Sequence, residues 1–105
     1  MSQNDLTLQE QADIFGVLSD PTRLKILKLL SLQNQPDALC VNALAHILGI
    51  TQSAVSQHLR ILKAAGMVKN EKRGYRVHYF LNRQKLAYYR EITGTVLGGD
   101  ELDLK

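Results

Sequence analysis

The sequence predicts a mainly α-helical domain that carries one small β-hairpin. Apolar residues recur at helical spacing up to residue 65, alternate as in strands between residues 67 and 81, and return to helical spacing after residue 83. The chain has 105 residues, enough for a modest core, and an apolar content of 45% is that of a folded protein. We therefore expect a single domain over residues 1–105.

Two helices are expected first. Residues 7–10 fit a capping box, so the first helix should run from Leu8 to about Ser19. Asp20 is placed to cap the second helix, and Pro21 suits its first position because the missing N–H is not needed there. The second helix is apolar over a wide face, so we expect it to be largely buried.

The next two helices match a helix-turn-helix. After a loop at residues 34–37, a short helix is expected over residues 41–48, with Gly49 at its C-cap, where a positive φ is required. Thr51 is placed to cap a longer helix that runs to about Ala65. In such a motif the second helix, the recognition helix, enters the major groove of DNA.

The expected recognition helix has one apolar face and one face suited to DNA. Val55, Leu59 and Leu62 share a side at spacing i, i+4 and i+7. The opposite side carries hydroxyls, amides and cations but no carboxylate, whereas a solvated face usually mixes both signs of charge. Hydroxyls and amides hydrogen-bond to base edges, and cations hold phosphates. The predicted contacts are Gln52, Ser53, Ser56 and Gln57 for the bases, and Arg60 and Lys63 for phosphate.

A basic hairpin, or wing, follows this helix. Strands are expected over residues 67–71 and 76–81, closed by a turn at residues 72–75. Residues 60–85 hold eight Lys or Arg against the single acid Glu71, a net charge of +7 that is typical of a protein with a polyanionic partner. An ordinary solvated basic surface is the alternative. The cations predicted to reach phosphates or the adjacent minor groove are Lys72, Arg73 and Arg76.

A final helix is expected from Arg83 to about Leu97, with Asn82 as its cap. Its apolar stripe needs a covering surface, which predicts dimerisation; the alternative is that the stripe packs on its own domain. Residues 98–105 are expected to form an acidic, mobile tail. The stripe consists of Leu86, Tyr89, Ile92 and Val96.

The order of these elements is that of a winged helix-turn-helix. Residues 18–27 (LSDPTRLKIL) and 52–62 (QSAVSQHLRIL), followed by residues 65–68 and 73–79, carry motifs in an order and spacing by which the sequence resembles the ArsR/SmtB family of bacterial and archaeal repressors. The resemblance covers nearly the whole chain. It implies a homodimer that represses transcription until an inducer weakens its binding to double-stranded operator DNA. It also implies a dimer interface of the first and last helices, with Phe15, Leu18, Leu86, Tyr89, Ile92 and Val96.

The metal sites usual in that family are not matched. Many members carry a Cys-Val-Cys thiolate pair at the start of the third helix, where this chain has Cys40 and Asn42, and one thiolate beside an amide is a poor site for a soft metal. Other members place ligands early and late in the last helix, where the nearest residues here are Arg83, Lys85, Val96 and Gly99. We therefore expect no metal and no cofactor.

The three histidines lack a spacing suited to a metal ligand set. His58 is expected on the flank of the recognition helix, His46 on the preceding helix and His78 on the outward face of a wing strand. Each is interpreted as a packed or solvated histidine.

Cys40 is the only cysteine, so no disulfide can form within one chain, which fits a reducing cytoplasm. Two interpretations of this thiol stay open. It is a small buried hydrophobe, or it is a redox or thiol-reactive sensor that is modified or paired across subunits. The start of a helix favours reactivity, but no Lys or Arg is near in the sequence, so the buried thiol is preferred.

Residues 1–5 lack the basic and apolar regions of a signal peptide, and no apolar run approaches the ~20 residues that span a bilayer. We expect a cytoplasmic protein with no membrane partner. The leading hypothesis is a sequence-specific DNA-binding repressor with an unidentified inducer. The alternatives are a thiol-responsive repressor and a winged-helix module that binds protein. An enzyme is not expected, because the chain has no Gly-rich phosphate loop and no catalytic His/Cys or paired-carboxylate pattern.

Overall fold

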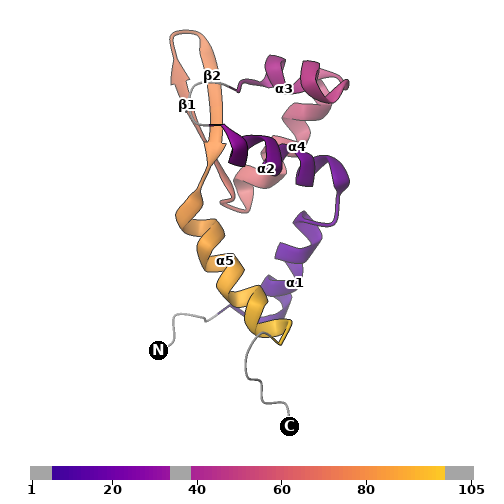
Figure 1. The fold of residues 1–105 in the computed structure, drawn as a ribbon, viewed down its shortest axis with the longest axis vertical. Coiled ribbons are helices and arrows are strands. Elements are labelled where there is room, and N and C mark those ends of the chain that lie inside the picture. Colours follow the sequence, from indigo (N-terminus) through magenta and orange to yellow (C-terminus); the bar gives the residue numbers. More distant parts are fainter. Residues whose placement is uncertain (1–5, 34–38, 99–105) are drawn as a thin grey trace.

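The computed structural model describes residues 6–33 and 39–98, so the loop predicted at 34–37 and all but the first residue of the predicted tail at 98–105 lie outside the described residues. Five helices and a two-stranded antiparallel sheet confirm the predicted winged helix-turn-helix (Figure 1). The elements are α1 (Leu8–Val17), α2 (Pro21–Leu32), α3 (Val41–Leu48), α4 (Gln52–Ala64), β1 (Val68–Arg73), β2 (Arg76–Leu81) and α5 (Arg83–Val96).

The predicted caps start the first two helices. The N–H of Glu10 donates to Oγ1 of Thr7 at 3.0 Å, and the Glu10 carboxylate accepts from the N–H of Thr7 at 2.8 Å, which completes the capping box. Oδ1 of Asp20 accepts from the first turn of α2. Helix α1 ends at Val17, earlier than the predicted Ser19, because the chain must be extended at Asp20, before a proline.

The core lies between α2, α3, α4 and the start of β1. Its largest fully buried side chains are Ile26, Leu30, Leu44, Val55, Leu59, Leu62, Met67 and Val68. The apolar face predicted for α4 is therefore confirmed. Helix α2 is less buried than predicted, since Leu24 and Leu32 are 48% and 67% exposed.

The wing is longer than predicted. Strand pairing continues to Arg73 opposite Arg76, so the turn contains only Gly74, at φ +67°, and Tyr75. A two-residue turn of this kind favours a residue with positive φ, which glycine supplies at least cost. Lys72 and Arg73, predicted in the turn, are strand residues instead.

His78 is less exposed than expected for the outward face of a wing strand, at a point where a neighbouring segment pairs with the edge of β2. The main chain at Cys40 forms an isolated bridge with His78, and the N–H of Tyr79 donates to the carbonyl of Leu39 at 3.0 Å. His78 is half-buried, and its Nδ1 is buried without a hydrogen-bond partner among the described residues.

The molecule is elongated, with principal extents of 52, 24 and 22 Å. The wing and α3 lie at one end of the long axis, and α5 and α1 lie together at the other (Figure 1). Within the described residues, no helix has both the length and the apolar character needed to cross a membrane.

Candidate nucleic-acid interface

Helix α4 presents the six of its residues predicted to contact DNA on one exposed surface. Its opposite face holds Val55, Leu59 and Leu62, each at most 1% exposed, so packing sets the rotation of the helix about its axis. Thr51 accepts from the N–H of Ala54 at 3.0 Å and starts the helix as predicted. The predicted contacts that are exposed on α4 are Gln52, Ser53, Ser56, Gln57, Arg60 and Lys63.

The turn before α4 follows the prediction for Gly49. Its φ is +69°, and its N–H donates to the carbonyl of Ala45 at 2.9 Å, which closes α3 in the left-handed conformation. Because this turn is short, the first turn of α4 lies close to α3, and the two helices pack together.

One contact across the helix-turn-helix was not predicted. Nε2 of Gln52 donates a hydrogen bond to Oδ1 of Asn42 at 3.1 Å, and both residues are exposed. Asn42 is the second residue of α3 and Gln52 is the first of α4. No local pattern in the sequence indicates this pair, because it depends on how the two helices pack.

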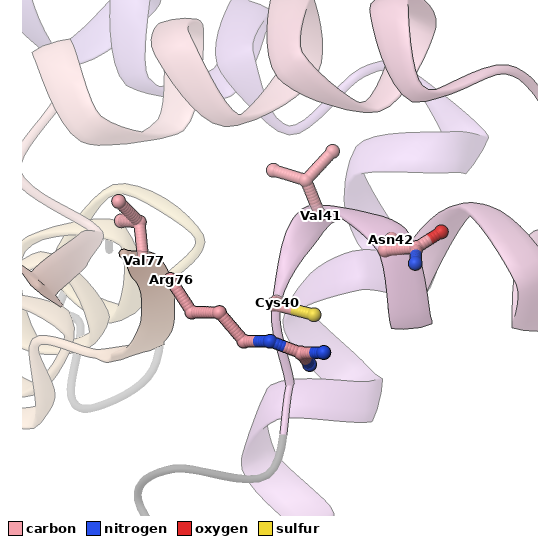
Figure 2. Close-up of a pocket in the computed structure, with 5 residues that line it drawn as sticks. All are labelled: Cys40, Val41, Asn42, Arg76 and Val77. Carbon is pink, nitrogen blue, oxygen red and sulfur yellow. The ribbon is translucent and has the colours of Figure 1, made fainter. Parts of the chain in front are cut away.

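The three predicted wing cations are exposed but face different neighbours. The Arg73 guanidinium lies 3.2 Å from the carboxylate of Glu71, on the same strand. Arg76 extends from β2 towards Cys40 at the start of α3 (Figure 2). Lys72 is exposed on β1. Lys72 and Arg73 thus lie on strand β1 of the wing, and Arg76 lies between the wing and α3.

A hollow of about 290 Å³ lies between the wing and α3 (Figure 2). Its cysteine, Cys40, is half-buried and occupies the N-cap of α3 without a side-chain capping bond. No cation lies close to this thiol in the sequence, because the strand that carries Arg76 returns to it only in the folded chain. The lining residues are Cys40, Val41, Asn42, Arg76 and Val77.

A cluster around Arg23 ties α4 to the end of α1. Its Nε donates to the carbonyl of Val17 at 2.7 Å, and its Nη1 lies 3.4 Å from Nδ1 of His58 on the recognition helix. The N–H of Arg23 also donates to the Asp20 carboxylate, and mainly this bond holds the pKa of Asp20 below its usual value. His58 therefore packs against a guanidinium at the flank of α4, as a packed histidine.

The other residues tested as ligands are dispersed. His46 is exposed on α3, while His78 is half-buried at the base of the wing. In the part of the chain that the structure describes, no group of three or more His, Cys, Asp or Glu residues is arranged to hold a metal ion.

The residues predicted at a dimer interface fall into two sets. Phe15 and Val96 are 37% and 51% exposed, and the same two helices expose Leu8 and Leu97 at their ends, at 80% and 75%. The others pack within their own domain, fully for Ile92 at 4% exposure and partly for Leu18, Leu86 and Tyr89. The stripe on α5 is therefore divided between residues that the domain itself covers and the exposed Val96 near the end of the helix.

Known proteins share this architecture. A sequence profile of the family described as bacterial regulatory protein, arsR family, matches residues 20–70. An uncharacterised HTH-type transcriptional regulator of Methanocaldococcus jannaschii is 41% identical over 73 residues, which are 70% of this chain and 79% of that protein. A solved structure of an ArsR-like transcriptional regulator from Rhodococcus sp. RHA1 is 30% identical and superposes with a TM-score of 0.70, over 84% of this chain and 79% of the other. The chain belongs to the ArsR family.

This ArsR-family protein is also similar to a protein of Synechocystis sp. named transcriptional repressor SmtB homolog. The two are 38% identical over 85 residues, which are 80% of this chain but 61% of that relative, so the chain spans less than two thirds of the relative's length. The family resemblance predicted from residues 18–27 and 52–62 is confirmed. The matched profile covers α2, α3, α4 and the start of β1, which together form the helix-turn-helix and its support.

Proposed function

We propose that this ArsR-family protein is a sequence-specific DNA-binding repressor of transcription that an inducer releases from its operator. The observation that carries the proposal is the exposed face of α4, which has hydroxyls, amides and cations without a carboxylate and stands beside a basic wing. The family and the naming of its relatives as transcriptional regulators and repressors support regulation over catalysis. Such a repressor acts on the chromosome, so we also propose a cytoplasmic location.

In this proposal α4 lies in the major groove of double-stranded operator DNA. The side chains at Ser53, Ser56 and Gln57 meet base edges, and Arg60 and Lys63 hold phosphates on the flank. The wing reaches the backbone next to the same groove. Its contributing cations are Lys72, Arg73 and Arg76.

We further propose a homodimer formed through α1 and α5. The support for it is that α1 and α5, which pack together, both expose large apolar residues, among them Phe15 and Val96. A two-fold dimer places two recognition helices in successive major grooves, roughly 34 Å apart. The operator is then a near-palindrome with one half-site for each subunit.

Genomic footprinting and selection from random DNA test the main proposal. The wild type should enrich one near-palindromic sequence, and the double variant Ser56→Ala/Gln57→Ala should lose that preference while it keeps salt-dependent, non-specific binding. His46→Ala is the matched control, since His46 is exposed on the neighbouring helix α3. If the double variant selected the same DNA sequences as the wild type, α4 would not be the helix that reads the bases. Failure to bind any genomic DNA at low salt would favour the protein-binding module instead.

A thiol-responsive repressor is the second candidate, and the position of Arg76 favours it. The guanidinium shares a hollow with the half-buried Cys40 at the start of α3 (Figure 2), and a neighbouring cation is one of the features of reactive cysteines. Footprints of the wild type and Cys40→Ser should then differ under oxidant stress, when only the variant stays bound. Equal release of both proteins by oxidant or by metal would exclude Cys40 as the sensor.

A further inference from the structure

The amide pair between Asn42 and Gln52 joins the first turns of the two helices of the helix-turn-helix. The bond is 3.1 Å long, with Gln52 as donor and Asn42 as acceptor. Its two ends stand on fixed supports, because Leu44 of α3 and Val55 of α4 are fully buried in the core. The Gln52 side chain is therefore tethered at its tip, although the residue is exposed.

The bond to Asn42 uses only part of the hydrogen-bonding capacity of the Gln52 carboxamide. A glutamine amide has two N–H donors and one carbonyl acceptor. Asn42 accepts one proton of Nε2, which leaves the carbonyl oxygen and the other Nε2 proton of Gln52 for a further partner. A glutamine that presents its carbonyl oxygen and an N–H together matches N6 and N7 of adenine in the major groove, its usual bidentate partner.

We propose that Asn42 is a positioning residue for operator recognition, which holds the Gln52 carboxamide so that its free edge reads an adenine in each half-site. The proposal rests on the proposed function and adds a residue outside the recognition helix to it. Asn42 acts through Gln52, because an untethered glutamine side chain loses rotamer freedom when it binds, and the tether removes part of that loss in advance.

The pair of Asn42 and Gln52 contributes little to the stability of the domain. Both residues are exposed, and the Thr51 hydroxyl already caps α4 without help from either. A solvent-exposed hydrogen bond exchanges contacts with water and contributes little net stability. Loss of the pair should therefore change which bases are preferred while leaving the thermal unfolding temperature close to that of the wild type.

Selection from random DNA followed by sequencing tests this with four variants of the full chain. Asn42→Ala and Gln52→Ala should each reduce the preference for adenine at the same single position of each half-site, by about two- to tenfold for Asn42→Ala, the range of one hydrogen bond. Asn42→Asp keeps an acceptor for Nε2, so it should retain the adenine preference while its charge lowers affinity for all sequences. His46→Ala should match the wild type at every position.

Three outcomes would overturn the inference. In the first, Asn42→Ala selects the same DNA sequences as the wild type. In the second, Asn42→Ala changes the preference at a position that Gln52→Ala does not affect. In the third, Asn42→Asp loses the adenine preference as fully as Asn42→Ala does. A wild type that enriches no sequence at all would instead refute the proposed function, which separates the two failures. The double variant Asn42→Ala/Gln52→Ala should select the same DNA sequences as Gln52→Ala alone, because the carboxamide that Asn42 binds is already absent.

Discussion

The hydroxyl of Tyr89, on α5, donates a hydrogen bond to the main-chain carbonyl of Ala65 at 2.7 Å, at the point where the recognition helix α4 ends. Lys85 covers the same point, since a Cβ placed on Gly66 would lie 3.2 Å from its Cε. The terminal helix, which carries part of the proposed dimer interface, is thus joined directly to the C-terminal end of the helix proposed to read DNA. A displacement of α5 would act on the C-terminal end of α4 through this bond.

The first prediction concerns this bond. Tyr89→Phe removes the hydroxyl and leaves the carbonyl of Ala65 without that donor, so the free energy of unfolding should fall by about 1 kcal/mol, the usual net value of such a bond. Urea denaturation measures it. Tyr75→Phe is the control, because Tyr75 is 93% exposed in the turn of the wing, and an equal loss in that variant would mean that the Tyr89 bond has no special role.

The same hydroxyl predicts a response to alkaline pH. Burial raises the pKa of Tyr89 above its ordinary value of 10.0. The folded state therefore holds this proton more tightly than the unfolded chain, so the contribution is complete below pH 10.0 and is lost as pH rises through the raised pKa. Denaturation between pH 9 and 11 should show a steeper loss for the wild type than for Tyr89→Phe; parallel curves would contradict it.

The wing predicts different effects for two neighbouring cations. Lys72→Ala removes one charge, so the slope of log K against log salt should become shallower by about 0.9, the value for one phosphate contact. Arg73→Ala should lower affinity more than Lys72→Ala, because it also leaves the Glu71 carboxylate unpaired near the DNA backbone. Titrations at several salt concentrations distinguish the two.

Two further variants control the wing experiment. Glu71→Gln combined with Arg73→Ala should recover part of the affinity, since the repelling carboxylate is then gone. Lys25→Ala, an exposed cation on α2, should leave the slope unchanged. A slope for Lys72→Ala identical to that of the wild type would show that the wing does not contact phosphate.

What the sequence predicts well is local. The bonds of Asp20 to the start of α2, and the positive φ of Gly49, are set by residues within a few positions, so residue type and spacing suffice to predict them. The buried face of α4 follows in the same way from helical periodicity, because one apolar stripe must face the core. The exposed face proposed to contact DNA is the opposite side of the same helix.

What the sequence does not predict depends on tertiary packing. His78 alternates outward on its strand, yet the main chain at Cys40 covers it, and no period-2 pattern contains that information. The approach of Arg76 to Cys40 and the pair of Asn42 with Gln52 likewise require the folded chain. The division of the α5 stripe has the same origin, since only packing decides which of its residues the domain itself covers.

The exposed end of α1 and α5 predicts the oligomeric state. Phe15→Glu/Val96→Glu places two carboxylates in the proposed apolar interface, and loss of about 1.5 kcal/mol or more of apolar burial at each position should raise the dimer dissociation constant at least about 100-fold. Light scattering after size-exclusion chromatography measures the mass. Leu32→Glu is the control, because Leu32 is 67% exposed on α2, far from this end. A wild type that is monomeric at micromolar concentration would refute the interface.

The last prediction concerns acid, through Asp20 at the N-cap of α2. The hydrogen bond from the N–H of Arg23 is the largest cause that lowers the pKa of this carboxyl from 3.8, and the positive charge of Arg23 and the presence of His58 act in the same direction. A lowered pKa means that the unfolded chain binds the proton first, so the charged cap stabilises the fold fully above pH 3.8 and ceases to do so as pH falls through the lower, folded value. Asn is also a good N-cap, so Asp20→Asn removes only the charge.

Urea denaturation from pH 2 to 7 should therefore show the wild type more stable than Asp20→Asn near neutral pH, with the two curves converging in acid. Asp20→Ala loses the cap itself and should stay below Asp20→Asn at every pH, because Thr22 and Arg23 then keep no side-chain acceptor for their N–H groups. If the difference between the wild type and Asp20→Asn were the same at pH 2 as at pH 7, the carboxylate charge would have no part in starting α2, and the cap would act through its hydrogen bonds alone.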